Sequence, residues 1–250
     1  MYSPTFEEFC KKTKKGNLIP VYKEILADME TPVSAFQKIN GGKYSFLLES
    51  VEGGEKWARY TFLGFNPSII FRSKGNRVEI IKNGKKEMLE ATDSPLDRLR
   101  DLMGEYKPVE TDELPRFFGG AVGYLSYDMV RFFEELPDKT TDDMELYDSF
   151  FVITDTILIF DSLKQTLKVV SNVHLTDDDD PEAAYKEAVT KIDSIVLRLK
   201  EPAKKALSET AAESRIDVTS NFSKSEFENA VIKAKEHIIA GDIIQAVLSQ

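Results

Sequence analysis

The sequence predicts an α+β protein with antiparallel sheets and flanking helices. Apolar runs of strand length, separated by turn residues, fill residues 44–90 and 117–173. The dipeptide Asn83-Gly84 is typical of a tight turn between two antiparallel strands. Helix-capping residues precede the segments that are expected to be helical near both ends of the chain. With 250 residues, 42% of them hydrophobic, the chain is long enough for one large domain or two ordinary ones.

Two helices are expected before the first strands. Thr5 and Glu8 have the spacing of a capping box, and Gly16 is expected to end that helix. Thr31 is expected to cap the second helix, with Pro32 at its first position. A third capped helix is expected at residues 94–103, between the two groups of strands.

The strands are expected in two groups. Within the second group, residues 161–164 are expected to form the turn of an antiparallel pair. The expected strand segments are 44–50, 57–65, 67–73, the hairpin 77–89, 117–130, 149–161 and 165–173.

Beyond residue 176 the pattern becomes helical. The acidic run 177–180 lacks the glycine and late glutamate of a calcium loop, so we interpret it as a solvated helix start. The following helix has one apolar face, made of Tyr185, Ala188, Ile192, Val196 and Leu199. Residues 201–219 resemble a linker. A capping box at Ser223 and Glu226 begins another helix, which Gly241 ends, and a strand is expected at 243–250.

Composition excludes several classes of protein. A formal net charge of −10 makes nucleic acid an unfavourable partner. No run of about 18 apolar residues is present to span a membrane, and the N-terminus has no signal-peptide pattern. The single cysteine, Cys10, favours a reducing compartment, so we expect a cytoplasmic protein.

Local motifs for chemistry are scarce. Gly119, Gly120 and Gly123 do not have the spacing of a phosphate-binding loop and are better explained by close backbone approach. His174 and His237 are interpreted as packing or surface residues. No zinc site, catalytic triad or paired carboxylates can be identified. Asp128 and Arg131 are expected to form a structural ion pair.

The segment YSFLLES (44–50) raises a sharper question, because an apolar strand ends in Glu49 and Ser50. One interpretation is a strand that simply reaches solvent. The other is a polar cluster at the mouth of an apolar pocket, where Glu49 could bind an ammonium and Arg59, on the next strand, a carboxylate. Such a pocket would suit a zwitterion with an apolar side chain.

Several long motifs occur in the order of a known family. NLIPVYKEILADM, YSFLLESVEGGEKWARYTFLGFNPSIIF, FFGGAVGYLSYDMVRFFEELP and SNFSKSEFENAVIKAKEHIIAGDIIQAVLSQ resemble anthranilate synthase component I. The resemblance runs from Asn17 to Gln250 with a lapse over the linker. It implies an α+β fold of which the C-terminal part is absent, with a regulatory region at 1–200, a linker at 201–219 and the start of the chorismate-binding region at 220–250.

The resemblance also implies a function. The whole enzyme would be a lyase of tryptophan biosynthesis that converts chorismate and ammonia or glutamine to anthranilate and pyruvate. Mg²⁺ would be bound by residues downstream of this stretch, and a glutamine amidotransferase subunit (component II) would supply ammonia. This stretch alone would be inactive. Alternatives are aminodeoxychorismate synthase component I, of folate synthesis, and a non-catalytic amino-acid-binding or partner-docking module.

Site residues follow from the same resemblance. The LLES segment of the family lines the site for tryptophan, the feedback inhibitor, and the matching residues here are Leu47, Leu48, Glu49 and Ser50. Arg59 is the matching basic residue, with Lys56 as the alternative. Relatives that add water to chorismate carry a general-base lysine where this chain has Gln245, whose amide cannot accept a proton at neutral pH. Gln245 therefore favours the enzymes that use ammonia.

Overall fold

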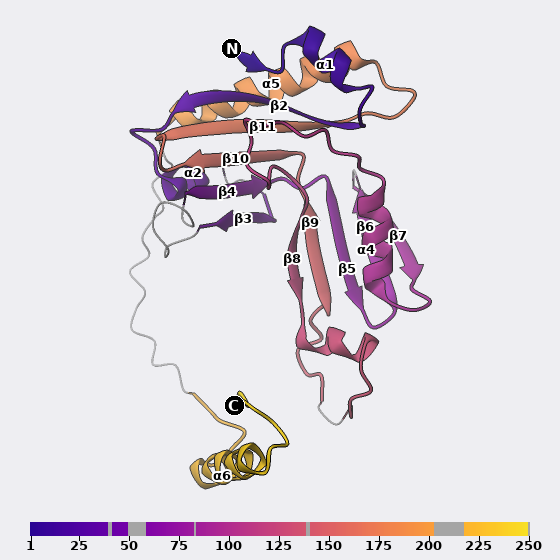
Figure 1. Cartoon of the computed structure of the whole chain (residues 1–250), viewed down its shortest axis with the longest axis vertical. Coiled ribbons are helices and arrows are strands. Elements are labelled where there is room, and N and C mark those ends of the chain that lie inside the picture. Colours follow the sequence, from indigo (N-terminus) through magenta and orange to yellow (C-terminus); the bar gives the residue numbers. More distant parts are fainter. Residues whose placement is uncertain (40–41, 50–58, 83, 139–140, 203–217, 250) are drawn as a thin grey trace. The chain divides into compact units, whose positions relative to one another are not determined.

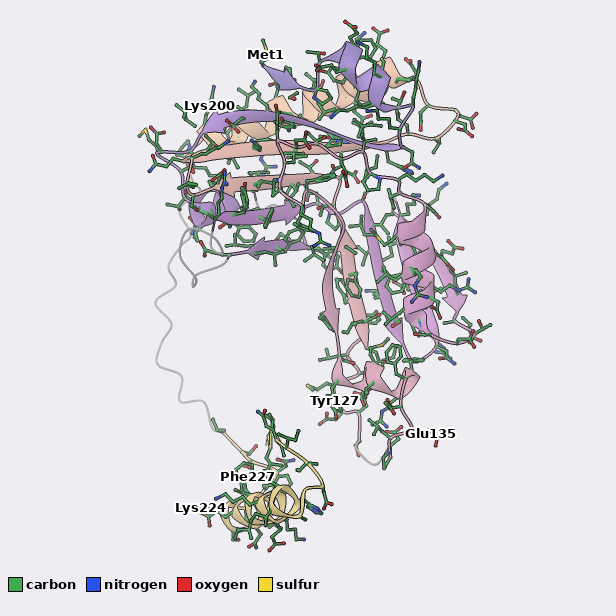
Figure 2. All side chains as sticks on the ribbon, viewed as in Figure 1. Met1, Tyr127, Glu135, Lys200, Lys224 and Phe227 are labelled. Atoms are coloured by element: carbon green, nitrogen blue, oxygen red, sulfur yellow. The ribbon has the colours of Figure 1, made fainter. Side chains whose placement is uncertain are left out.

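A computed structural model of the chain describes residues 1–39, 42–49, 59–82, 84–138, 141–202 and 218–249. The chain divides into two compact units, Met1–Lys204 and Lys205–Gln250, each of which is described by itself. Figure 1 labels the helices and strands, and Figure 2 adds the side chains.

The first unit contains a six-stranded antiparallel sheet with the strand order β1-β2-β11-β10-β4-β3. Helices α1, α2 and α5 cover one face of it and bury the largest apolar core of the unit, which includes Phe9, Ile39, Leu63 and Ile192. The strands are Tyr2–Ser3 (β1), Leu18–Leu26 (β2), Ser45–Leu48 (β3), Tyr60–Phe65 (β4), Thr156–Asp161 (β10) and Thr166–His174 (β11). The helices are Phe6–Lys12 (α1), Pro32–Ile39 (α2) and Pro181–Lys200 (α5).

A five-stranded antiparallel sheet with the order β7-β6-β5-β9-β8 completes the unit, and its strands run in a different direction from those of the first sheet (Figure 1). Helix α4 packs on one face of it around Phe71, Val78 and Leu102. The elements are Ile69–Lys74 (β5), Arg77–Lys82 (β6), Lys85–Glu90 (β7), Ala121–Leu125 (β8), Ser149–Ile153 (β9), Pro95–Gly104 (α4) and the 3₁₀ helix Tyr127–Phe132 (η1). This architecture confirms the predicted α+β class.

The prediction of one strand over 149–161 is wrong. Ile153 pairs with Ile69 in the five-stranded sheet, whereas Thr156 pairs with Ser171 in the six-stranded sheet. The chain therefore leaves one sheet and enters the other at residues 154–155. The polar residues Thr154, Asp155 and Thr156 separate the two apolar halves at this point, but one strand was predicted across them.

The predicted turns and caps are largely confirmed. Strands β6 and β7 are joined by a two-residue turn, since Lys82 pairs with Lys85; Gly84 has a φ of +75°, while Asn83 lies outside the described residues. Strands β10 and β11 form the expected antiparallel pair. Thr5 and Glu8 form the capping box, but α1 ends at Lys12 rather than at the glycine.

Two further corrections concern the first unit. Residues 117–130 form only the short strand β8, which is followed by η1 and its exposed Tyr127 (Figure 2). Gly16, predicted to end α1, lies against the carbonyl oxygen of Lys107, where a Cβ would clash. Strand β2 was not predicted from periodicity.

Asp180 links the acidic run to helix α5. Its carboxylate accepts hydrogen bonds from the backbone N–H groups of Glu182 and Ala183, both at 3.2 Å, so it is the N-cap of the helix. The apolar face predicted for this helix is confirmed, because Ala188, Ile192, Val196 and Leu199 are buried.

We expect the substitution Asp180→Ala to lower the free energy of unfolding by about 1 kcal/mol, because it removes this cap. Urea denaturation of the two proteins measures the effect. Asp177→Ala is the matched control, since Asp177 has no hydrogen bond with any described residue. An equal loss in both variants would contradict the capping role.

In the second unit, helix α6 (Lys224–Ala240) has the predicted capping box at Ser223 and Glu226, and Gly241 closes it with a φ of +82°. None of its described residues is buried; Figure 2 labels Lys224 and Phe227 on this helix. The predicted strand over 243–250 is not found: residues 243–249 adopt neither helix nor strand. A strand needs a neighbour for its backbone groups, and no described strand pairs with this segment.

Candidate functional site

Predicted binding residues meet in an open groove of the first unit, which we name the β3–β8 groove. Its volume is about 790 Å³, within the range of small-molecule sites. Four of the predicted residues, Leu47, Leu48, Glu49 and Arg59, line it. The complete lining is Leu47, Leu48, Glu49, Arg59, Tyr60, Phe62, Phe117, Ala121, Val122, Gly123 and Phe151. Ser50 and the alternative basic residue Lys56 lie outside the described residues.

Strand β3 supplies one wall because its side chains alternate between two faces of the sheet. Leu47 packs against the core beneath the helices, while Phe46 packs on the opposite face with Tyr60 and Phe62. Leu48 and Glu49, at the end of the strand, are exposed. The strand thus carries apolar side chains up to the groove and a carboxylate to its edge.

Aromatic side chains and a close strand contact form the opposite wall. The rings of Phe62 and Phe117 meet edge to face, with centroids 5.1 Å apart. Gly123 of β8 lies so close to β9 that a Cβ there would be 2.7 Å from the Cα of Phe151 and would clash with the carbonyl oxygen of Phe150. The interpretation of this glycine as a site of close backbone approach is therefore confirmed.

Arg59 lines the groove but already binds a carboxylate of the protein. Its Nε and Nη2 donate to Asp161 Oδ1 and Oδ2 at 3.0 and 2.6 Å, and its guanidinium lies 4.8 Å from the ring centroid of Tyr60. A ligand carboxylate would have to use the remaining N–H groups of the guanidinium. Asp161 therefore fixes the orientation of Arg59.

Asp161 is buried at the turn between β10 and β11, where it also accepts hydrogen bonds from the backbone N–H groups of Leu163 and Lys164, both at 3.2 Å. Burial alone would raise the pKa of its carboxyl. The hydrogen bonds from Arg59 and from the backbone of Lys164 outweigh burial, so the pKa of Asp161 lies below its ordinary value. The carboxylate is thus charged at neutral pH.

Sequence reasoning did not find Asp161, which is 102 positions from Arg59 along the chain. Neither residue carries a local motif, so only the strand pairing of β4 with β10, which places Tyr60 opposite Asp161, brings them together. Phe117 was also missed, because it belongs to the segment before β8 and not to β3 or β4.

Other singled-out residues have structural contacts. Asp128 accepts a hydrogen bond from Arg131 Nε at 2.9 Å, which confirms the predicted ion pair. His237 lies 2.8 Å from Asp242 at the end of α6. Gln245 belongs to the second unit and is exposed.

The Mg²⁺ ion that the resemblance implies has no matching ligands here: within the described ranges, no three His, Cys, Asp or Glu side chains are grouped as metal ligands. We assign no metal ligand to this chain. Among the helices that the structure describes, none is both long and apolar enough to cross a membrane.

Comparison with known proteins identifies the family. The profile of the family described as chorismate binding enzyme matches residues 43–250. The chain belongs to the chorismate-binding enzyme family. The match includes β3, the residues on both sides of the groove and the whole second unit.

Two similar proteins carry the name anthranilate synthase component 1. Anthranilate synthase component 1 of Acetivibrio thermocellus is 42% identical over all of this chain and 51% of its own length. The protein of the same name from Aquifex aeolicus is 41% identical over 98% of this chain and 50% of its own length. The chain spans about half the length of these curated relatives.

A solved structure gives the same fold. The crystal structure of anthranilate synthase component I from Streptococcus pneumoniae TIGR4 matches with a TM-score of 0.54 and 23% identity, over 87% of this chain and 46% of that chain. This likeness confirms the expected fold of the family.

Proposed function

We propose that this chain is part of an anthranilate synthase component I, which converts chorismate and ammonia or glutamine to anthranilate and pyruvate. The observation that carries the proposal is the match over the full chain, at 42% identity, to a relative of that name. The chorismate-binding profile over residues 43–250 supports the substrate. As part of this proposal, the enzyme works in the cytoplasm with Mg²⁺ and a glutamine amidotransferase subunit.

The test of the activity uses the protein in which this chain is joined to the remaining half of the family's length. With chorismate, ammonia and Mg²⁺ it should form anthranilate, which fluoresces by itself. Formation of aminodeoxychorismate instead would overturn the proposal in favour of the folate enzyme. No consumption of chorismate would favour a non-catalytic binding module.

Within this function, we assign the β3–β8 groove to regulation by tryptophan. Its apolar and aromatic walls suit an indole ring, and Glu49 at its edge suits the ammonium of an amino acid. Arg59, oriented by Asp161, has further N–H groups for the carboxylate. Binding here and chorismate binding would be coupled reciprocally, typically by about 1–3 kcal/mol.

We expect Glu49→Gln to weaken tryptophan binding about tenfold or more, because a charge-assisted hydrogen bond becomes a neutral one. Inhibition curves of anthranilate formation measure this change. Ser50→Phe, which puts a bulky ring beside Glu49 in the sequence, should relieve inhibition more strongly.

Glu87→Gln is the matched control for Glu49→Gln, since Glu87 is exposed on β7 and does not line the groove. Glu49→Gln and Ser50→Phe should both keep their activity without tryptophan. Unchanged inhibition in both would remove the groove from consideration as the inhibitor site, while the proposed reaction would stand.

A further inference from the structure

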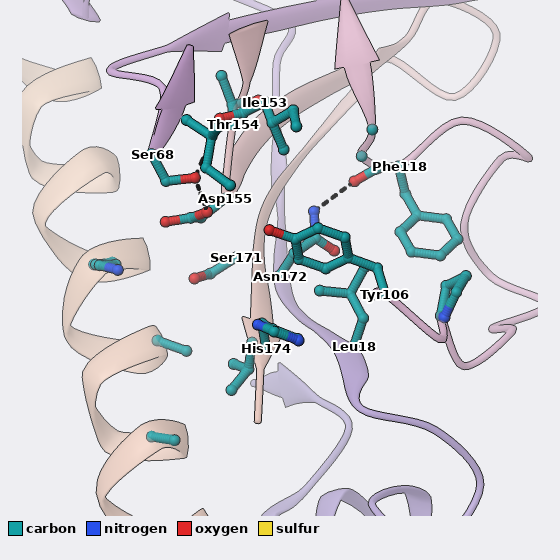
Figure 3. Close-up of a pocket in the computed structure, with 18 of the residues that line it drawn as sticks. Leu18, Ser68, Tyr106, Phe118, Ile153, Thr154, Asp155, Ser171, Asn172 and His174 are labelled. Carbon is teal, nitrogen blue, oxygen red and sulfur yellow. Dashed lines mark hydrogen bonds between the residues drawn. The ribbon is translucent and has the colours of Figure 1, made fainter. Parts of the chain in front are cut away.

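A second cavity of the first unit has no role in the proposed function. We name it the β11–α5 cavity; its volume is about 610 Å³, and it shares no lining residue with the β3–β8 groove. Its walls come from β11, α5, the end of α4 and the crossing between β9 and β10 (Figure 3). A cavity of this size fits a small molecule.

Two hydrogen-bond acceptors line this cavity, on Asp155 and Asn172. The backbone N–H of Asn172 donates to the carbonyl oxygen of Asp155 at 2.7 Å, one position beyond the last pair of β10 and β11. The Asp155 carboxylate accepts a hydrogen bond from the Ser68 hydroxyl at 2.6 Å, and no described cation pairs with it. Both side chains line the cavity (Figure 3).

The amide of Asn172 is only half satisfied. Its Nδ2 donates to the carbonyl oxygen of Phe118 at 2.8 Å, but its Oδ1 has no hydrogen-bond partner among the described residues. The residue is only 8% exposed. A buried amide oxygen without a donor is unfavourable, so this position is suited to a ligand that brings one.

Cationic side chains lie at the rim. Arg116 and Lys82 line the cavity, are exposed, and have no ion-pair partner in the part of the chain that the structure describes. Other charged groups of the lining are already engaged. Lys191 pairs with Glu187 at 3.1 Å, and Asp179 accepts two hydrogen bonds, each 2.7 Å long, from a threonine three residues earlier.

About half of the lining of the cavity is apolar or aromatic. The rings of Tyr106 and His174 are 4.6 Å apart between centroids. Burial, followed by the charge of Asp155, raises the pKa of Tyr106, so its hydroxyl stays neutral. The apolar side chains include those of Leu18, Ile69, Met103, Phe118, Ile153 and Val173.

We propose that the β11–α5 cavity binds a small zwitterion, whose primary ammonium is held by Asp155 and Asn172 and whose carboxylate is held by Arg116. An ammonium has three N–H donors, enough to serve both Asp155 and Asn172. The rim cations disfavour a simple amine, and Asp155 disfavours a simple carboxylate. The apolar walls select a spacer of methylene groups or an aromatic ring between the two charges.

The probes are 4-aminobutanoate and 6-aminohexanoate, with hexylamine and hexanoate as analogues that carry one charge each. Saturation-transfer NMR and titration calorimetry on the full chain should detect binding of at least one zwitterion, more tightly than either analogue. Asp155→Asn should weaken that binding about tenfold or more. Arg116→Gln, at an exposed position, should weaken it about threefold.

Arg77→Gln is the control, since Arg77 is exposed on β6 and does not line the cavity. The inference is overturned if neither zwitterion binds, if hexylamine binds as tightly, or if both cavity variants bind like the unsubstituted chain. If tryptophan displaces the probe from the unsubstituted chain but not from Glu49→Gln, the probe binds in the β3–β8 groove. That result would also overturn the inference. Anthranilate formation has no part in these measurements, so a failure here leaves the proposed function intact.

Discussion

The substitution Gly123→Ala is expected to lower the free energy of unfolding by about 3 kcal/mol. This value is at the upper end of the usual range for adding atoms to a closely packed site. The added Cβ would clash with the carbonyl oxygen of Phe150 and lie 2.7 Å from the Cα of Phe151. Both contacts are with backbone, so no side-chain rotation can relieve them. Strand β8 would have to move away from β9, and the β3–β8 groove would lose one wall.

Urea denaturation measures the loss of stability. Titration calorimetry with tryptophan, the ligand proposed for the β3–β8 groove, measures the loss of binding there. Gly104→Ala is the matched control, because a Cβ at this last residue of α4 has no atom within 4 Å. Alanine also favours the helix over glycine, so this variant should be as stable as the unsubstituted chain or more stable. If Gly123→Ala were equally harmless, β8 would not be held as closely to β9 as described.

The second large effect is expected for Asp161→Ala, which should lower the free energy of unfolding by about 3 kcal/mol. Removal of the Asp161 carboxylate leaves the partly buried charge of Arg59 unpaired. The Arg59 side chain is 30% exposed, so water compensates part of the loss and the value stays at the lower end of that range. The turn between β10 and β11 also loses the acceptor for two backbone N–H groups. The pair of Asp128 and Arg131 is the control: the Asp128 side chain is 55% exposed, so Asp128→Ala should lower the free energy of unfolding by less than about 1 kcal/mol.

This contribution of Asp161 should depend on pH in one direction. Its pKa is lower in the folded chain than the ordinary value of about 3.9, so the folded state binds the proton less well than the unfolded state. The stabilisation is therefore complete above about pH 4 and is lost as the pH falls through the lower, folded pKa. Urea midpoints of the unsubstituted chain and Asp161→Ala should differ most near neutral pH and converge in acid. A gap that widens in acid would contradict the assignment.

Local signals in the sequence were sufficient for many elements. The caps at Thr5, Ser94 and Ser223 depend on residues only two or three positions away, and all three are found. The hairpin at Gly84 likewise follows from its own turn chemistry. Such features depend on nearest neighbours and can be derived without tertiary structure.

Features that depend on distant neighbours were missed. The polar residues Thr154, Asp155 and Thr156 interrupt the apolar run at the crossing, but which sheet each half joins depends on strands distant in the sequence. The predicted strand around Gln245 has the right composition but no described partner. In the groove, LLES pointed to Leu48 and Glu49, whereas Asp161 could be found only once β4 and β10 were paired.

The crossing between the sheets ties the two cavities to one short piece of chain. Phe151 borders the β3–β8 groove, while Ile153, Thr154 and Asp155 border the β11–α5 cavity. Side chains in a strand alternate, so a slip of β9 by one residue against β5 would turn Phe151 and Ile153 to the opposite face of the sheet. The pairing register of this one strand therefore affects the walls of both the groove and the cavity.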